Sequence, residues 1–204
     1  MSDSPFKVIG NRNGDGAINW IKFTIDIALN ILNHRLTSKE NYTEEEFHIN
    51  ELITRELLGR NIWKFSEAYG KFRGCPFWSV KAFDHFVSMK KQNKTKAEYE
   101  KNLRHEHVYP QILLIKKLKD LKKPSFKILE DLFKKYAIAA VITKDENDLL
   151  NKAKLKTLTI SDENIWKRYN NKDVQIKIKN NSLNNDFFKY HKAKMEETKV
   201  FDKN

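Results

Sequence analysis

The sequence contains little cysteine, glycine or proline, and each shortage excludes a class of protein. The single cysteine, Cys75, rules out an internal disulfide and a zinc site of four thiolates, and it fits a reducing compartment. Six glycines and four prolines in 204 residues argue against a β-sandwich or a loop-rich fold. No apolar run reaches the roughly 18 residues of a membrane span, and the first residues lack the basic and apolar regions of a signal peptide. We therefore expect a cytoplasmic protein with no membrane partner.

Acidic residues are also outnumbered by basic ones. Lys and Arg together number 39 against 27 Asp and Glu, which gives a formal charge of +12. The lysines are spread along the whole chain, so no single basic tail accounts for the charge. A charge of this sign favours an anionic partner, most often nucleic acid. The alternative is a soluble lysine-rich protein without such a partner.

Helical periodicity dominates the first half of the chain. A central helix is expected after Gly16, since its apolar residues cover too wide an arc for an exposed surface helix. Thr43 and Glu46 form the sequence pattern of a capping box, which predicts a second helix over residues 43–58 that ends at Gly59. A third helix is expected over residues 77–91. The polar residues 90–102 are either a domain boundary or an exposed connection inside one domain.

Strand signals appear only in the second half. A strand ending in Glu106-His107 is followed by helices from Pro110 to about residue 121 and over 126–136, then by an apolar strand at 137–143. Asp145 is a candidate cap for a helix from Glu146 to about residue 155. Residues 174–179 alternate as a strand would, and residues 182–199 are predicted as a basic closing helix. The fold class is therefore α+β and predominantly helical.

One run of residues points directly to chemistry. In Glu106-His107-Val108-Tyr109-Pro110, a carboxylate precedes a histidine and a proline closes the strand. Asn147 and Asn151 lie four residues apart on the later helix, so they share a face. Carboxylate and amide oxygens suit Mg²⁺, and a neutral His107 beside such an ion could deprotonate water for attack on a phosphodiester.

These residues resemble the two halves of the HNH nucleases, the His-Me finger or ββα-metal family. Glu106-His107-Val108-Tyr109-Pro110-Gln111 is similar to the first motif. Residues 141–152, Val-Ile-Thr-Lys-Asp-Glu-Asn-Asp-Leu-Leu-Asn-Lys, are similar to the second half, in which a strand leads into a helix that carries an Asn. The resemblance covers residues 101–156. It implies a small ββα-metal finger with a helical insertion at about 111–136, packed with an N-terminal helical region.

The resemblance also implies a role for each matching residue. Glu106 corresponds to the metal-ligand carboxylate and His107 to the general base. Asn147 or Asn151 corresponds to the ligand on the helix, and Asp145 is a ligand or a cap. The cofactor would be Mg²⁺ or Mn²⁺. No Asn lies between Pro110 and Asn147, so the middle Asn of the family pattern has no counterpart.

Two further observations bear on this site. In a straight strand, alternation places His105 and His107 on one face and Glu106 on the other, so a bulge or strand end must bring Glu106 and His107 together. Arg168 is a candidate bidentate clamp for the scissile phosphate or the leaving strand; the alternative is that Lys167 and Arg168 form an exposed basic pair beside a core tryptophan, Trp166. The candidates for contact with nucleic-acid phosphates are basic residues on either side of the motifs: Arg104, Lys144, Lys152, Lys154, Lys156 and Lys167.

Three functions follow from the sequence. The first is a metal-dependent HNH-type endonuclease that cleaves DNA, with RNA as the other substrate. The second is a non-catalytic, basic, helical nucleic-acid-binding protein, and the third is a protein-interaction or inhibitor module. The expected segments are residues 1–95, which position substrate or form a homodimer, a catalytic region at 96–160 and a basic extension at 161–204; the alternative is one compact domain. Convergence of Glu106, His107 and the asparagines would separate the first function from the second.

Overall fold

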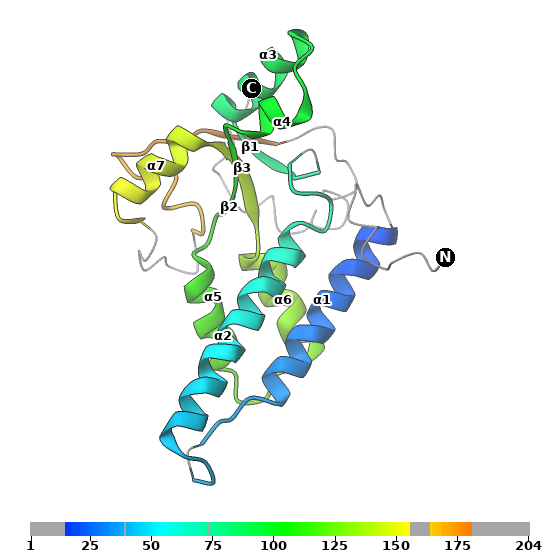
Figure 1. The fold of residues 1–204 in the computed structure, drawn as a ribbon, viewed down its shortest axis with the longest axis vertical. Coiled ribbons are helices and arrows are strands. Elements are labelled where there is room, and N and C mark those ends of the chain that lie inside the picture. Colours follow the sequence, from blue (N-terminus) through cyan, green and yellow to red (C-terminus); the bar gives the residue numbers. More distant parts are fainter. Residues whose placement is uncertain (1–14, 39, 73, 156–163, 181–204) are drawn as a thin grey trace.

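The chain folds into a helical body around one small sheet (Figure 1). The computed structural model describes residues 15–38, 40–72, 74–155 and 164–180. The α+β, predominantly helical class predicted from the sequence is confirmed. Within the described ranges, no helix has both the length and the apolar character needed to cross a membrane. Lys156 and the predicted closing helix at 182–199 lie outside the described residues.

The helices and strands follow one another in mixed order. The helices are α1 (Asp15–Asn33), α2 (Glu44–Ser66), α3 (Val80–Lys91), α4 (Lys96–Glu100), α5 (Gln111–Lys119), α6 (Phe126–Tyr136) and α7 (Lys144–Lys152). The strands are β1 (Phe77–Ser79), β2 (Leu103–His107), β3 (Ala139–Thr143) and β4 (Ile178–Asn180).

The four strands form a single sheet in the order β2-β3-β1-β4. β2 pairs with β3 in antiparallel fashion, from Leu103 opposite Thr143 to His107 opposite Ala139. β1 runs parallel to β3 and antiparallel to β4. Strands from all three expected segments of the chain, 1–95, 96–160 and 161–204, therefore belong to one sheet.

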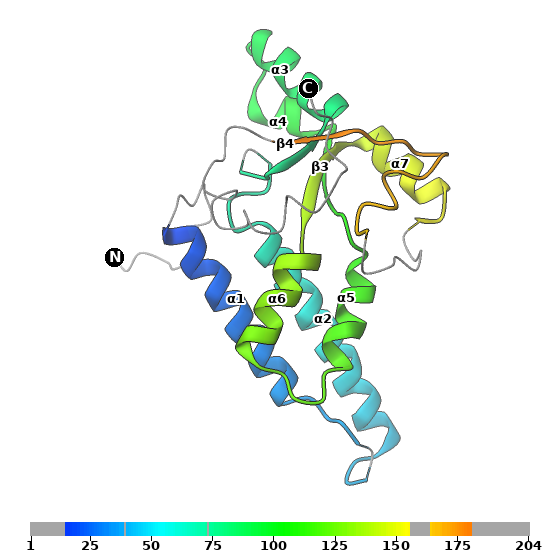
Figure 2. The same ribbon diagram turned by 180° about the vertical axis from the view of Figure 1, so that it is seen from behind.

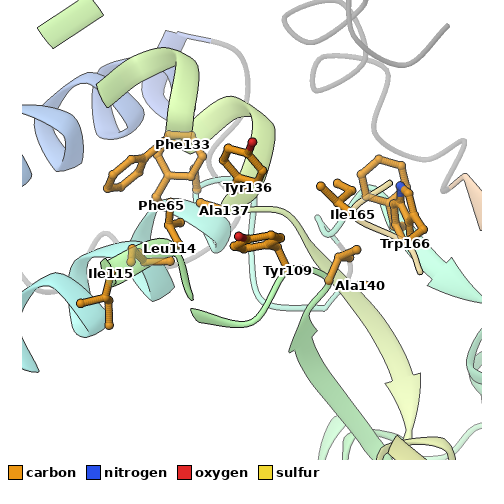
Figure 3. Close-up of a cluster of buried hydrophobic side chains, with 14 of the residues drawn as sticks. Phe65, Tyr109, Leu114, Ile115, Phe133, Tyr136, Ala137, Ala140, Ile165 and Trp166 are labelled. Atoms are coloured by element: carbon orange, nitrogen blue, oxygen red, sulfur yellow. The ribbon is translucent and has the colours of Figure 1, made fainter. Parts of the chain in front are cut away.

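Helices lie on several sides of this sheet. Figures 1 and 2 show α1, α2, α5 and α6 bundled beyond one end of the strands, α3 and α4 beyond the other, and α7 beside β2 and β3. Aromatic rings packed edge-on or tilted join α2 to α6 and α6 to the segment that follows β2 (Figure 3). The ring centroids of Phe65 and Phe133 are 5.0 Å apart, and those of Tyr109 and Tyr136 are 4.7 Å apart. Residues just after β2 are thereby fixed against α6.

Two helix boundaries differ from the sequence prediction. α2 continues through Gly59 to Ser66 because the glycine faces α5, where its carbonyl accepts a hydrogen bond of 2.6 Å from the Gln111 side chain. The third helix begins at Val80, since residues 77–79 form β1 and Ser79 caps the helix. The capping box of Thr43 and Glu46 is confirmed.

The start of α7 also differs. Asp145 is not its cap; Thr143 is. The Thr143 hydroxyl oxygen accepts a hydrogen bond from the Glu146 backbone N–H, and the Glu146 carboxylate accepts one from the Thr143 backbone N–H. Asp145 is an exposed residue in the first turn. The pattern Thr-x-x-Glu at 143–146 was readable from the sequence as a capping box.

Candidate functional site

Glu106 and His107 point to opposite faces of the sheet. β2 pairs with β3 residue for residue, with no bulge that would turn the two side chains to one side. Directly paired residues share a face, so Glu106 lies on the side of Ala140, where α7 packs. His107 lies on the other side with His105, as alternation requires. The structure therefore does not bring the predicted ligand and the predicted base together.

The Glu106 carboxylate is held by Arg168. A guanidinium nitrogen, Nη2, donates to Glu106 Oε1 at 2.8 Å, and Nη1 donates to the His107 carbonyl at 3.0 Å. The Arg168 side chain is only 2% exposed and that of Glu106 25% exposed. Burial raises the pKa of the adjacent Tyr169 hydroxyl well above its usual value, and the charge of Glu106 adds to that effect. Arg168 is thus a buried partner of the edge strand rather than a side chain presented to a phosphate.

His105 and His107 are enclosed on the opposite face. Their ring centroids lie 5.2 and 4.9 Å from that of Trp63 on α2. Both imidazoles are about 95% buried, and burial lowers the pKa of each to about 3. A general base works best when its pKa lies near the working pH, so His107 in this setting is a weak base as well as an inaccessible one.

The remaining candidate ligands lie on α7. Asn147 and Asn151 are partly exposed on this helix, and Asp145 is exposed. Among residues 15–155 and 164–180, apart from 39 and 73, no group of three or more His, Cys, Asp or Glu side chains is placed to hold a metal ion. A magnesium or manganese site built from Glu106, Asn147, Asn151 or Asp145 stays a prediction, because it needs the Glu106–Arg168 pair to open.

A buried carboxylate outside the predicted site residues links α7 to the sheet. Glu146, only 3% exposed, accepts a hydrogen bond of 2.6 Å from the Ser79 hydroxyl. Ser79 in turn caps α3 and Thr143 caps α7, so one carboxylate joins the starts of two helices. The capping pattern at residues 143–146 indicates the local part of this network. The contact with Ser79, 67 residues away in the sequence, is not indicated by any pattern in the sequence.

Cys75 has a structural role. Its thiol is buried and donates weak hydrogen bonds to the carbonyls of Phe77 and Ala139. Burial raises the pKa of this thiol to about 12. A thiol that stays protonated and covered is not a nucleophile.

Basic side chains lie on β2, along α7 and on the turns that follow α7. The Lys144 backbone donates to the Asn102 carbonyl at 2.8 Å, which fixes the start of α7 against the start of β2 and places Lys144 near Arg104. Lys152 and Lys154 follow at the exposed end of α7, and Lys167 is exposed beside Arg168. We call these five residues, all predicted phosphate contacts, the basic edge.

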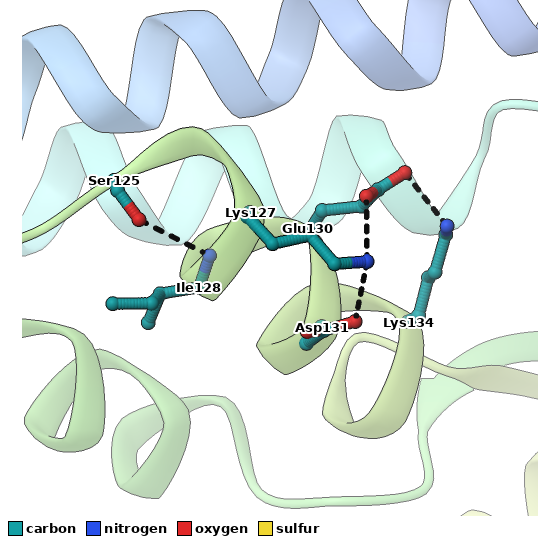
Figure 4. A network of polar contacts seen from close by, with 6 residues as sticks. All are labelled: Ser125, Lys127, Ile128, Glu130, Asp131 and Lys134. Atoms are coloured by element: carbon teal, nitrogen blue, oxygen red, sulfur yellow. Dashed lines mark hydrogen bonds and ion pairs between the residues drawn. The ribbon is translucent and has the colours of Figure 1, made fainter.

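The cations of the basic edge are not engaged by described carboxylates. Arg104 donates only to the carbonyls of Lys101 and Leu103, and none of the five forms an ion pair with another residue in the described ranges. The lysines of α6 provide a contrast: Lys127 pairs with Glu130 and Asp131, and Lys134 pairs with Glu130 (Figure 4). The basic edge therefore keeps its charge available to an anion.

Comparison of this chain with protein-family models, curated proteins and solved structures found no match.

Proposed function

We propose that this chain is a basic nucleic-acid-binding protein in which the Glu106-His107 run stabilises the fold instead of catalysing a reaction. One observation carries the proposal: the two residues lie on opposite faces of the sheet, one ion-paired with Arg168 and the other buried beneath Trp63. The formal charge of +12 supplies the attraction to a polyanion.

The proposed interface is the basic edge. Its lysines sit on exposed positions of a helix and of a turn, from which they can reach phosphate oxygens without reading bases. Asp145 and Asp148 on the same helix limit how closely a phosphate can approach its first turns. We therefore expect affinity that depends strongly on salt and little on sequence, for DNA and RNA alike.

The test is a titration of labelled double-stranded DNA and single-stranded RNA by fluorescence anisotropy at several salt concentrations. Combined substitution Lys144→Glu, Lys152→Glu and Lys154→Glu should weaken binding at least tenfold and lower the salt slope by about 1 for each phosphate that a lysine no longer neutralises. The matched control changes three other exposed lysines by the same charge: Lys22→Glu, Lys122→Glu and Lys123→Glu.

Equal losses of affinity in the two triple variants would contradict an interface at the basic edge. No measurable affinity at about 150 mM salt would contradict nucleic-acid binding altogether and favour the protein-interaction or inhibitor module.

A second candidate, the HNH-type endonuclease, is favoured by the order of elements. Two antiparallel strands, β2 and β3, are followed by α7, which packs against both, with α5 and α6 inserted between the strands. This is the element order that the ββα-metal resemblance implies. Catalysis would require Glu106 to leave Arg168 and bind a metal ion with an asparagine of α7.

Plasmid DNA incubated with Mg²⁺ or Mn²⁺ tests this candidate. An endonuclease should nick the plasmid, lose activity with EDTA, and lose it in Asn147→Ala with Asn151→Ala, two partly exposed positions whose truncation leaves the core intact. A His107→Ala variant that stays folded and cleaves like the parent would remove His107 from the mechanism.

A further inference from the structure

The first turns of α2 carry an apolar stripe on the outside of the molecule. Ile49, Ile53 and Leu57 follow one another at helical spacing with 47, 51 and 46% of their surface exposed, and Leu52 beside them is 47% exposed. Figures 1 and 2 show this end of α2 projecting past α5 and α6. Scattered exposed apolar residues are ordinary, but four on adjacent turns form a patch of the kind that marks an interaction site.

The stripe is not the core-facing side of the helix. The opposite side of α2 buries Thr54, Leu58 and Ile62 and packs against α1 and α5. Next to the stripe, an open groove of about 820 Å³ runs between α2 and α5. Its lining includes Leu52, Gly59, Trp63, Gln111, Ile112 and Ile115. The groove widens the apolar surface, since Ile112 is itself half exposed.

The charged residues beside the stripe differ in sign between the two ends of α2. The first turn of α2 is acidic, with Glu44, Glu45 and Glu46, whereas Arg60 and Lys64 follow the apolar residues. Arg60 already pairs with Glu56 at 2.6 Å, but both side chains remain largely exposed and Arg60 has further donors. An acidic start and a basic end make this face complementary to itself when it is reversed.

We propose that a second copy of this chain covers the stripe, with the two α2 helices packed antiparallel about a two-fold axis beside Ile53. In this register Ile49 faces Leu57 of the partner subunit, and Glu46 faces Arg60 of the partner subunit. A parallel arrangement would set the acidic turns against each other. A face that contacts its own copy through a two-fold axis gives a closed dimer.

The size of the surface sets the expected strength. A helix of 23 residues is about 35 Å long. We expect a contact made by one such helix and its flanking groove to bury no more than the roughly 800 Å² per partner of a standard interface. We therefore expect a dimer that dissociates at micromolar concentration. The proposal is independent of the basic edge on α7, because the stripe lies on a different helix.

Sedimentation velocity between about 1 and 200 µM tests the dimer. The parent mass should rise with concentration toward twice the 24.2 kDa of one chain. Ile53→Glu should hold the protein as a monomer over the same range, since it sets two carboxylates beside the axis. Ile128→Glu, an equivalent change at an exposed isoleucine on α6, should dimerise like the parent. Circular dichroism of each variant checks that the fold is kept.

A disulfide tests the register. Cys75 is buried, so a cysteine introduced at position 53 is the reactive thiol of an Ile53→Cys variant. Mild oxidation should link two copies of Ile53→Cys rapidly and two copies of Ile128→Cys slowly. A parent that remains monomeric at the highest concentration, a dimer unaffected by Ile53→Glu, or equal linking of the two cysteine variants would each overturn the proposal.

Discussion

Arg168 connects the edge strand to a segment 61 residues further along the chain. Its guanidinium bonds both to a carboxylate and to a backbone carbonyl of β2, and it is almost wholly covered. A charge buried in this way needs its partner, because removing either one leaves the other desolvated and unpaired. The Glu106–Arg168 pair is therefore a structural element whether or not the chain binds nucleic acid.

Truncation of this side chain should be costly. Arg168→Ala leaves the Glu106 carboxylate three-quarters buried without its cation, and we expect unfolding to become easier by about 3 kcal/mol. Lys167→Ala, at the exposed neighbour, should change stability by less than about 0.5 kcal/mol. Urea unfolding of both variants measures the difference. Equal stabilities would show that the pair contributes nothing.

The buried imidazoles predict how stability depends on pH. The pKa of His105 and that of His107 are lowered to about 3 in the folded chain, from an ordinary value of 6.5 in the unfolded one. Between these values the unfolded chain binds protons that the folded chain excludes, so stability is full above about pH 7 and falls as the pH decreases. Because the unfolded chain takes up at most one extra proton at each of the two histidines, the slope has an upper limit of about 3 kcal/mol per pH unit.

Urea unfolding at pH 7, 6 and 5 measures this slope. A His107→Gln variant, which cannot take up the proton, should show about half of the parent's dependence below pH 6. An unchanged slope in that variant would mean that His107 is protonated in the folded protein.

At the scale of the element, α2 shows how packing overrides a local stop signal. A glycine such as Gly59 often ends a helix. Here α2 continues past it, because the Gln111 side chain donates a hydrogen bond to the Gly59 carbonyl and α5 packs beside it. Glycine inside a helix still carries an entropic cost. A Cβ added at this position would make only ordinary contacts, 3.6 Å from Gln111 Oε1 and from Ile115 Cδ1.

Gly59→Ala should therefore stabilise the protein by about 0.5–1 kcal/mol. Gly74→Ala is the matched comparison, since a Cβ there would overlap the carbonyl of Tyr69, and it should destabilise the fold. Thermal unfolding of the two variants checks the opposite signs. A destabilised Gly59→Ala would mean that Gln111 loses its hydrogen bond when the methyl group is added.

The elements that could be predicted are those with local signals. Thr43 and Glu46 mark the start of α2, and alternation around His105 predicts both β2 and the division of its side chains between two faces. β1 could not be predicted, because Phe77-Trp78-Ser79 is too short to show a period and because its partner in β3 lies 63 residues further along the chain.

The candidate site was predictable to a similar extent. The strand and helix carrying Glu106 and Asn151 were placed correctly by their patterns. The partner of Glu106 was not, because Arg168 lies beyond the region of the motifs and nothing in its neighbourhood indicates a buried ion pair. The resemblance indicates Glu106 and His107 as ligand and base, whereas the pairing of β2 with β3 places their side chains on opposite faces of the sheet.

At the scale of the whole molecule, the sheet depends on distant parts of the chain. β3 lies between β2 and β1, and β1 also pairs with β4 near the end of the described residues. A fragment that contains the HNH-like motifs but not β1 therefore lacks a neighbour for its central strand and leaves the side chains of Val141 and Ala140 uncovered.

We expect residues 96–160, expressed alone, to show no cooperative unfolding transition by circular dichroism, whereas the full chain unfolds with one. The physical reason is that β2, β3 and the helices α4 to α7 lose the apolar cover of α1, α2, α3 and β1, and what they still bury is too little to offset their conformational entropy. A sharp transition in the fragment would show that residues 96–160 fold autonomously.

The position of β3 also has a consequence for synthesis on the ribosome. β1 is synthesised some sixty residues before β3, its neighbour in the sheet. Both edges of β1 therefore stay unpaired until β3 and then β4 have been synthesised. During that interval the growing chain carries the strand Phe77-Trp78-Ser79 with unpaired backbone edges, although α3 can already cover Trp78, and unpaired strand edges make nascent chains prone to associate with one another. Slow translation of residues 80–138 would lengthen that interval, so the yield of soluble protein should be sensitive to codon speed in this stretch more than anywhere after β4.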